Sequence, residues 1–193
     1  MQKIDSMSLT TSDGQECDTP HTSIPEEYSD SELPSYPSLS RMRFGTCPWK
    51  GGTYIIRELE TELVITLKEG VLRLCPEEKG HKGSSYSHGR GSHWKCVENE
   101  GMWLGFYNSV SGTYIRHNNK KTNWRFDAKG QCHDTWERFC AREHPDGGHI
   151  LLVKHNDDFR PMMAGGEDDR ELVVGSEGED ATRWEFVEVE SDS

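Results

Sequence analysis

Histidine and arginine are the side chains of this chain that could carry out proton chemistry or hold a polar ligand. Nine histidines occur; His117 directly follows Arg116, and His155 precedes an Asn-Asp-Asp run. A histidine titrates near neutral pH and can act as a general acid or base inside a pocket. Each of these histidines falls at the end of an expected strand, where a hydrogen-bonded surface histidine is the simpler interpretation. We keep them as ligand-binding candidates, and the catalytic residues, if any exist, stay unknown.

Two tryptophans could supply an aromatic surface for a ligand. Trp103 and Trp124 do not belong to the repeated tryptophan phrase described below, so repeat packing does not require them. Aromatic rings beside fixed donors are common in ligand pockets, and arginines such as Arg125 would provide such donors. The ligand-binding candidates are therefore Trp103, Trp124, Arg116, His117, His155 and Arg160.

Motifs for enzyme chemistry or metal binding are missing from the sequence. There is no Gly-x-Ser-x-Gly elbow, no phosphate-binding glycine loop and no histidine pair at helical spacing. The acidic runs at residues 156–158 and 167–169 could hold Mg²⁺, but turn residues beside them favour solvent-exposed turns. The densest Cys and His grouping, at residues 132–144, contains no C-x-x-C pair. We expect no metal and no cofactor, and whether the chain is an enzyme is left open.

Composition excludes several classes of partner. The 193 residues include 34 acidic and 22 basic side chains, for a net charge of -12. Nucleic acids are held mainly by clustered Lys and Arg, so we expect no nucleic-acid partner. No apolar run approaches the eighteen or so residues of a membrane span, and the first residues lack the apolar centre of a secretion signal. We expect a cytoplasmic monomer that does not enter membranes.

A repeated tryptophan phrase indicates which elements position these residues. Trp94, Trp136 and Trp184 each open a similar phrase, and the phrases recur roughly every 40 to 50 residues, which indicates internal repeats. Between them lie short runs rich in Val, Ile, Tyr and Phe, separated by Gly, Asn and Asp, a pattern typical of antiparallel strands and tight turns. No stretch predicts a helix. We expect the three tryptophans to lie on strands and to pack at matching depth in a core.

Four strands per repeat give twelve in total. The expected strands cover residues 52–56, 62–67, 71–74, the segment of Trp94, 102–107, 112–115, 124–127, the segment of Trp136, 148–153, 159–163, 171–174 and the segment of Trp184. Three such units predict an all-β fold, the β-trefoil, with six strands in a closed barrel and six in capping hairpins.

The β-trefoil is expected to occupy residues 44–190. Residues 1–43 are rich in Ser, Thr, Pro, Asp and Glu, and predict an acidic disordered tail. A long Gly-, Ser- and His-rich loop is expected at residues 76–92, where binding segments are often found.

The second repeat resembles a known family of repeats. It runs from an apolar strand through Ser-Gly-Thr-Tyr-Ile at residues 111–115 and Trp-Glu-Arg-Phe at residues 136–139 to Asp-Gly-Gly-His-Ile-Leu-Leu at residues 146–152. This order resembles fascin-type β-trefoil repeats, and the chain is also similar in texture to small single-trefoil proteins of filamentous fungi. The resemblance implies trefoil packing and an association with actin as one functional expectation. The Gln-x-Trp phrase of ricin-type sugar-binding trefoils is missing before all three tryptophans.

These observations favour a non-catalytic binding module that presents loops to a protein or a small apolar ligand. One alternative is a fungal enzyme of secondary metabolism, of cyclase or pericyclase type, because shape and desolvation can accelerate such reactions without a motif. An actin-associated, fascin-like protein is the other alternative.

Overall fold

A computed structural model describes residues 46–77, 90–120, 122–176 and 179–189. The predicted tail at residues 1–43 and most of the predicted loop at residues 76–92 lie outside these ranges.

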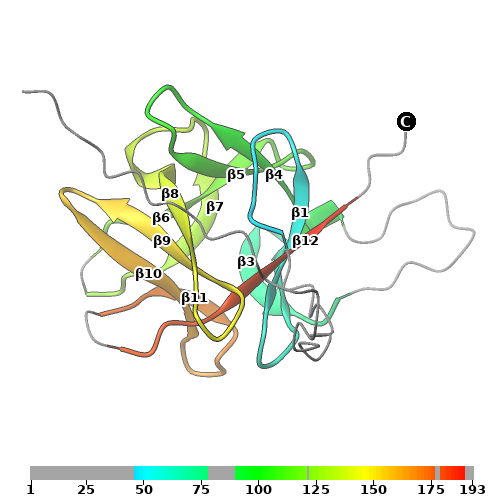
Figure 1. The fold of residues 1–193 in the computed structure, drawn as a ribbon, viewed down its shortest axis with the longest axis vertical. Helices are drawn as coiled ribbons and strands as arrows, with labels where there is room; N and C mark the ends of the chain where they lie inside the picture. The colour runs from blue at the N-terminus through cyan, green and yellow to red at the C-terminus, as the bar shows by residue number, and fades with distance from the viewer. Residues whose placement is uncertain (1–45, 78–89, 121, 177–178, 190–193) are drawn as a thin grey trace, which may run out of the picture. The chain divides into compact units, whose positions relative to one another are not determined.

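Twelve strands and two short 3₁₀ turns make up the described chain (Figure 1). They are β1 (Thr53–Glu58), β2 (Val64–Lys68), β3 (Val71–Cys75), η1 (Arg90–Ser92), β4 (His93–Glu98), β5 (Leu104–Asn108), β6 (Thr113–His117), β7 (Phe126–Gly130), η2 (Thr135–Glu137), β8 (Phe139–Glu143), β9 (His149–His155), β10 (Asp158–Gly165), β11 (Glu171–Val174) and β12 (Trp184–Glu188). The described residues contain no α-helix. The predicted count of strands is confirmed.

Six of these strands close into a barrel. The antiparallel pairs run from β1 to β4, β5, β8, β9 and β12, and β12 pairs with β1 again. Closure leaves none of the six strands with an unpaired edge that could recruit another chain. The ring consists of the first and fourth strand of each repeat, so the threefold spacing in the sequence becomes a threefold ring.

The other six strands form three hairpins: β2 with β3, β6 with β7, and β10 with β11. Their second strands, β3, β7 and β11, contact one another in pairs. The β2–β3 turn illustrates why the hairpins form, since Glu69 (φ 53°) and Gly70 (φ 78°) both adopt the positive φ of a two-residue type I′ turn. A closed six-stranded barrel with three mutually contacting hairpins is the predicted β-trefoil.

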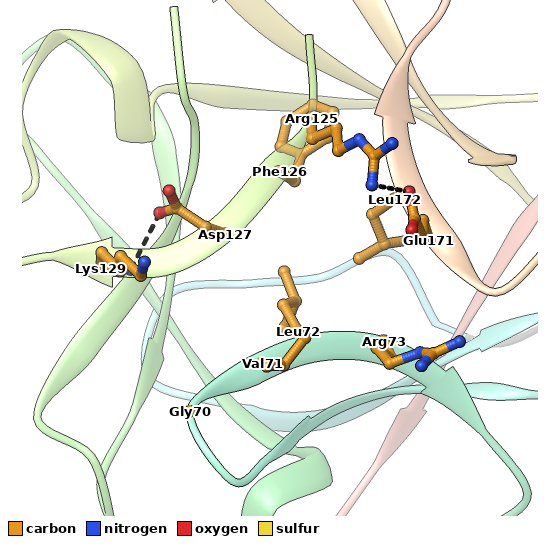
Figure 2. Close-up of a pocket in the computed structure, with 10 residues that line it drawn as sticks. All are labelled: Gly70, Val71, Leu72, Arg73, Arg125, Phe126, Asp127, Lys129, Glu171 and Leu172. Atoms are coloured by element: carbon orange, nitrogen blue, oxygen red, sulfur yellow. Dashed lines mark hydrogen bonds and ion pairs between the residues drawn. The ribbon is translucent and has the colours of Figure 1, made fainter. Parts of the chain in front are cut away.

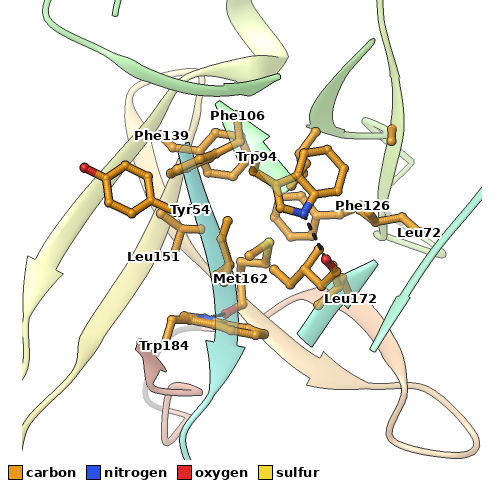
Figure 3. Packing of buried hydrophobic residues seen from close by; sticks show 14 of the residues in the cluster. Tyr54, Leu72, Trp94, Phe106, Phe126, Phe139, Leu151, Met162, Leu172 and Trp184 are labelled. Atoms are coloured by element: carbon orange, nitrogen blue, oxygen red, sulfur yellow. Dashed lines mark hydrogen bonds between the residues drawn. The ribbon is translucent and has the colours of Figure 1, made fainter. Parts of the chain in front are cut away.

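Large side chains fill the centre of the barrel (Figure 3). The Phe106 ring lies 5.6 Å from that of Phe139 and 5.8 Å from that of Phe186, and none of the three side chains is exposed. Ile56 and Val153 are equally buried, and they face Phe186 and Phe139 on the adjacent strands. Side chains therefore occupy the space that a substrate would need inside the barrel in the cyclase alternative.

Two of the repeated tryptophans are core residues, as predicted. Trp94 and Trp184 have no exposed surface, and each donates its indole N–H across to a hairpin carbonyl, at 2.9 Å to Ile65 and 3.0 Å to Met162. A buried indole needs such a partner, because an unmet donor costs about 1–3 kcal/mol. These two tryptophans fasten the first and third hairpins to the barrel.

The prediction for Trp136 is wrong. It lies in the turn η2, not in a strand, and 38% of its surface is exposed. The pairings explain why: Phe139 faces Val153 just as Phe186 faces Ile56 in the third repeat. Trp184 stands two residues before its phenylalanine, but Trp136 stands three before Phe139. Because side chains alternate faces along an extended chain, the extra residue turns Trp136 outward.

Candidate functional site

The outward turn of Trp136 creates a groove on the second repeat. We call it the Trp136 groove: it lies between the β6–β7 hairpin and η2 and has a volume of about 460 Å³. Around Trp136 it is lined by Arg116, Lys129, Gln131, Asp134, Thr135 and Glu137. The groove thus combines an exposed aromatic ring with an amide, a hydroxyl, two carboxylates and two cations.

The corresponding place in the first repeat is built differently. A groove of about 560 Å³ lies there between the β2–β3 hairpin and η1. Its described lining consists of Leu67, Pro76 and polar or small residues, and contains no aromatic side chain. The tryptophan of that repeat, Trp94, is buried in the core instead. Threefold packing therefore does not place an exposed tryptophan in this groove by itself.

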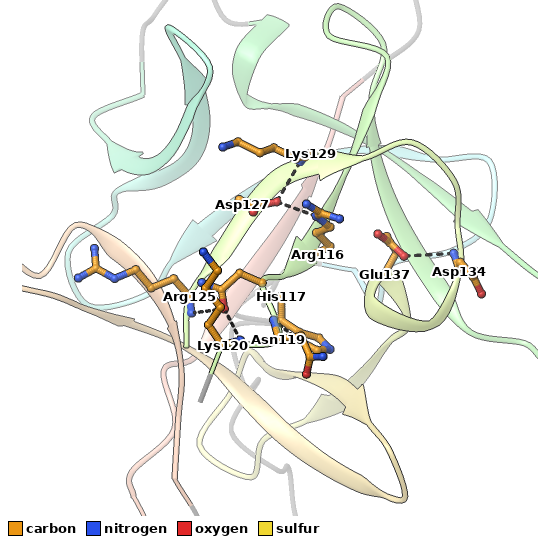
Figure 4. Close-up of polar contacts among 10 residues, drawn as sticks. Arg116, His117, Asn119, Lys120, Arg125, Asp127, Lys129, Asp134 and Glu137 are labelled. Carbon is orange, nitrogen blue, oxygen red and sulfur yellow. Dashed lines mark hydrogen bonds and ion pairs between the residues drawn. The ribbon is translucent and has the colours of Figure 1, made fainter. Parts of the chain in front are cut away.

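Arg116 holds the Trp136 ring in place. Its guanidinium carbon lies 5.7 Å from the ring centroid, in cation–π contact. The same side chain donates from Nε to Asp127 Oδ1 at 3.0 Å, which holds the guanidinium against β7 (Figure 4). An arginine fixed at both ends loses little further entropy when it meets a ligand. The aromatic side of the groove is therefore preorganised.

Glu137 occupies the inward position that tryptophan holds in the other two repeats. It stands two residues before Phe139 and is 5% exposed. One of its carboxylate oxygens accepts the backbone N–H of Asp134 at 3.2 Å, which closes the turn η2. Burial raises the pKa of Glu137, while that backbone hydrogen bond opposes the increase. A Cβ at Gly130 would lie 2.6 Å from the other carboxylate oxygen, so Gly130 makes room for this side chain.

A histidine–tryptophan cluster lies behind the groove. His117 is fully buried, and its ring lies 6.0 Å from that of Trp136. Its Nδ1 accepts hydrogen bonds from the Trp124 indole at 3.3 Å and from the Asn119 backbone at 3.2 Å. The His155 ring lies 4.5 Å from that of Trp124. We call His117, Trp124 and His155 the histidine cluster.

His117 is held in the neutral form at neutral pH. Burial lowers its pKa to about 4, and nearby His155 and Arg116 act in the same direction, while the backbone of Lys154 opposes them. Two donors engage Nδ1, so the ring proton resides on Nε2. An engaged Nδ1 is a poor general base, because it would have to give up both hydrogen bonds to take a proton. The cluster therefore supports the groove structurally.

The structure separates the six predicted site residues. Arg116, His117, Trp124 and His155 come together at the second repeat, whereas the Trp103 ring packs against Phe159, with centroids 5.6 Å apart. Lys154 and His155 are consecutive on β9 and approach different tryptophans: Lys154 Nζ lies 5.4 Å from the Trp103 ring.

Arg160, the remaining predicted site residue, forms an ion pair with Asp158, with 3.6 Å between Nη2 and Oδ2. Trp136, which the sequence assigned to the core, is the site residue that sequence reasoning missed. Its Trp-x-x-Phe spacing, one residue longer than Trp-Glu-Phe at residues 184–186, is the signal that distinguishes it.

The part of the chain that the structure describes contains neither a metal-binding cluster nor a membrane-spanning helix. No three His, Cys, Asp or Glu side chains there are grouped as a metal site would require. Within the same residues, no helix has the length and apolarity needed to cross a bilayer.

Comparison with known proteins places the fold and leaves the family open. No protein-family model matches the chain, and no curated protein sequence matches it significantly. Among solved structures, the ricin B-like lectin of Macrolepiota procera in complex with lactose is similar, with a TM-score of 0.53 and 17% identity over 74% of this chain and 99% of the lectin. The Rhizoctonia solani agglutinin has a TM-score of 0.53 and 15% identity over 75% of this chain and 100% of the agglutinin.

A designed threefold-symmetric protein, ThreeFoil, is also similar, with a TM-score of 0.54 and 14% identity over 72% of this chain and 99% of the design. At these identities the likeness establishes the β-trefoil fold. The resemblance to fascin repeats stays a prediction.

Proposed function

We propose that the chain is a non-catalytic binding module whose Trp136 groove holds a saccharide. The observation that carries the proposal is the 38% exposure of Trp136, whose two repeat equivalents have no exposed surface. Exposing part of an indole gives up burial energy, and a preorganised aromatic ring beside polar groups is the usual composition of a ligand site.

The groove's chemistry matches both sides of a sugar ring. A pyranose offers a face of C–H groups that can pack on an indole and a rim of hydroxyls that donate and accept hydrogen bonds. Gln131 provides an amide, Asp134 a carboxylate and Thr135 a hydroxyl along the same groove. The sugar hydroxyls can form hydrogen bonds with this mixture of donors and acceptors, and no charge has to be buried.

The Macrolepiota procera lectin of the same fold, whose structure holds lactose, supports a saccharide as the class of ligand. The chain lacks the Gln-x-Trp phrase of ricin-type repeats. The residues that would hold the sugar are therefore those of the Trp136 groove, and we do not transfer any contact from the lectins.

Glycan-array screening of the full chain, followed by calorimetric titration of the strongest glycan, tests the proposal. Trp136→Ala should weaken binding at least tenfold, and Trp136→Phe should retain part of it, because a smaller ring keeps some of the apolar contact.

The matched control is Trp49→Ala, which removes a tryptophan that is 72% exposed and lies outside the groove. It should bind as the unmodified chain does. A chain that binds no glycan on the array refutes the saccharide class, and a glycan that Trp136→Ala binds with unchanged affinity refutes the site.

A further inference from the structure

A second cavity lies where the three hairpins meet (Figure 2). We call it the hairpin cavity; it is bounded by residues 70–73 of β3 and its turn, residues 125–127 and Lys129 of β7, and Glu171 and Leu172 of β11. Its volume is about 200 Å³.

An unequal closure of the hairpins accounts for the cavity. The β7–β11 junction is joined by the Val174 N–H, which donates to the Trp124 carbonyl at 3.0 Å, and the β3–β11 junction by the Leu74 N–H, which donates to Arg170 at 2.8 Å. Within the described residues no backbone hydrogen bond joins β3 to β7. β3 and β7 therefore meet through side chains alone, and the cavity lies between them.

The floor of the hairpin cavity is apolar. Each hairpin contributes one buried side chain to it: Leu72 from β3, Phe126 from β7 and Leu172 from β11, which are 6%, 5% and 1% exposed. Val71, which is 55% exposed, extends this apolar surface toward solvent. Such a surface favours a ligand with a hydrocarbon body, because covering it releases water from both partners.

Among the described residues, one positive charge on the rim of the cavity has no ion-pair partner. Asp127 is paired with Arg116, Glu171 with Arg125, and Arg73 with Asp168.

Lys129, by contrast, has no ion pair among the described residues. A ligand with one negative charge would complete the pairing. A neutral or cationic ligand would leave the Lys129 ammonium without an ion pair, even though the chain as a whole carries more carboxylates than cations.

We infer that the hairpin cavity binds a small carboxylate with an apolar body, with the hydrocarbon on the Leu72–Phe126–Leu172 floor and the carboxylate at Lys129. Either a free organic acid or the C-terminus of a peptide ending in an apolar residue presents this group. The inference concerns a different cavity from the Trp136 groove, and Lys129 is the one residue of the described ranges that lines both.

Titration of the ¹⁵N-labelled full chain with hexanoate tests the inference, with hexylamine as the charge-reversed probe. Hexanoate should shift the amide signals of residues 70–73 and 125–127, and hexylamine should not. Lys129 also lines the Trp136 groove, so the position of the site is taken from residues 70–73, which do not. The inference is wrong if hexanoate shifts no amide signals, if the shifted signals are scattered over the surface, or if hexylamine shifts the same signals.

Two variants test the roles of charge and floor. Lys129→Gln should weaken hexanoate binding at least fivefold, and so should Val71→Asp, which places a negative charge on the exposed edge of the floor. The matched control Lys95→Gln removes an exposed lysine of β4 and should bind as the unmodified chain does. Unchanged hexanoate affinity in Lys129→Gln contradicts the inference.

A tetrapeptide ending in leucine, titrated as the free acid and as the amide, separates the two sources of the carboxylate. Tighter binding of the peptide acid than of hexanoate assigns the cavity to a peptide C-terminus, and tighter binding of hexanoate assigns it to a free organic acid. A peptide amide that binds as tightly as the peptide acid contradicts the role of the carboxylate.

Discussion

Replacing the three repeated tryptophans one at a time by alanine should divide them into two classes of stability. Trp94 and Trp184 are fully buried and each donates one hydrogen bond to a hairpin carbonyl. Truncating a buried aromatic side chain costs about 3–5 kcal/mol, and the carbonyl left without its donor adds to that cost. We expect Trp94→Ala and Trp184→Ala each to lower the free energy of unfolding by about 4–5 kcal/mol.

Trp136→Ala should cost much less. A side chain that is 38% exposed keeps roughly three-fifths of an indole's 200 Å² or so from water, which at about 25 cal/mol/Å² is an upper bound of about 3 kcal/mol. Residual compactness of the unfolded chain lowers this bound, and a surface truncation leaves no enclosed cavity. We expect a loss of about 2 kcal/mol or less.

Urea unfolding followed by far-UV circular dichroism measures all three variants on one scale, provided that the slope of free energy against urea stays constant. Trp49→Ala, at a site that is 72% exposed, is the control and should stay within about 0.5 kcal/mol of the unmodified chain. If Trp136→Ala costs as much as Trp94→Ala, within about 0.5 kcal/mol, the outward orientation of Trp136 is wrong.

Three further predictions concern the second repeat. Deleting Arg138 restores the Trp-Glu-Phe spacing of the third repeat and should turn Trp136 inward, so that its fluorescence shifts to the blue and becomes less accessible to acrylamide; an unchanged spectrum argues against the spacing rule. Burial lowers the pKa of His117 to about 4, below its unfolded value of about 6.5, so the unfolded chain protonates this histidine first as the pH falls. The stability present above pH 6.5 should therefore fall by up to about 3 kcal/mol toward pH 4. His117→Gln should flatten that decline in pH-dependent unfolding, His144→Gln should not, and equal slopes in both variants would contradict the assignment. Arg116→Ala should weaken glycan binding about threefold to tenfold in calorimetry by releasing the Trp136 ring, and an unchanged affinity would show that the cation–π contact does not organise the groove.

The barrel could be predicted from the sequence because its signals repeat. Three similar phrases, four strands between them and turn residues such as Gly70 each point to the same architecture. The burial of Trp94 and Trp184 follows from the same pattern, because threefold packing favours a large apolar residue at this position of each repeat. The first and third repeats place a tryptophan there. Fold and core were therefore accessible from residue types and spacing.

The site was accessible only in part. Arg116, His117, Trp124 and His155 could be selected as candidates, but their meeting depends on how β6, β7 and β9 lie beside one another, which residue types do not specify. Trp103 was grouped with Trp124 because both fall outside the repeated phrase, although Trp103 packs on Phe159 and Trp124 lies in the histidine cluster. Trp136 was missed because the repeated phrase outweighed a single inserted residue, which reverses the side-chain direction.

The indole N–H signals of the tryptophans provide the most direct test of the account, because each reports on one ring. During titration of the ¹⁵N-labelled chain with the strongest glycan from the array, the account predicts that the Trp136 indole signal shifts with the binding curve. The Trp94 and Trp184 signals, whose N–H groups are bonded to Ile65 and Met162 in the core, should stay in place. A glycan that binds without moving the Trp136 signal, or that shifts Trp94 and Trp184 instead, would contradict the proposal that the Trp136 groove is the binding site.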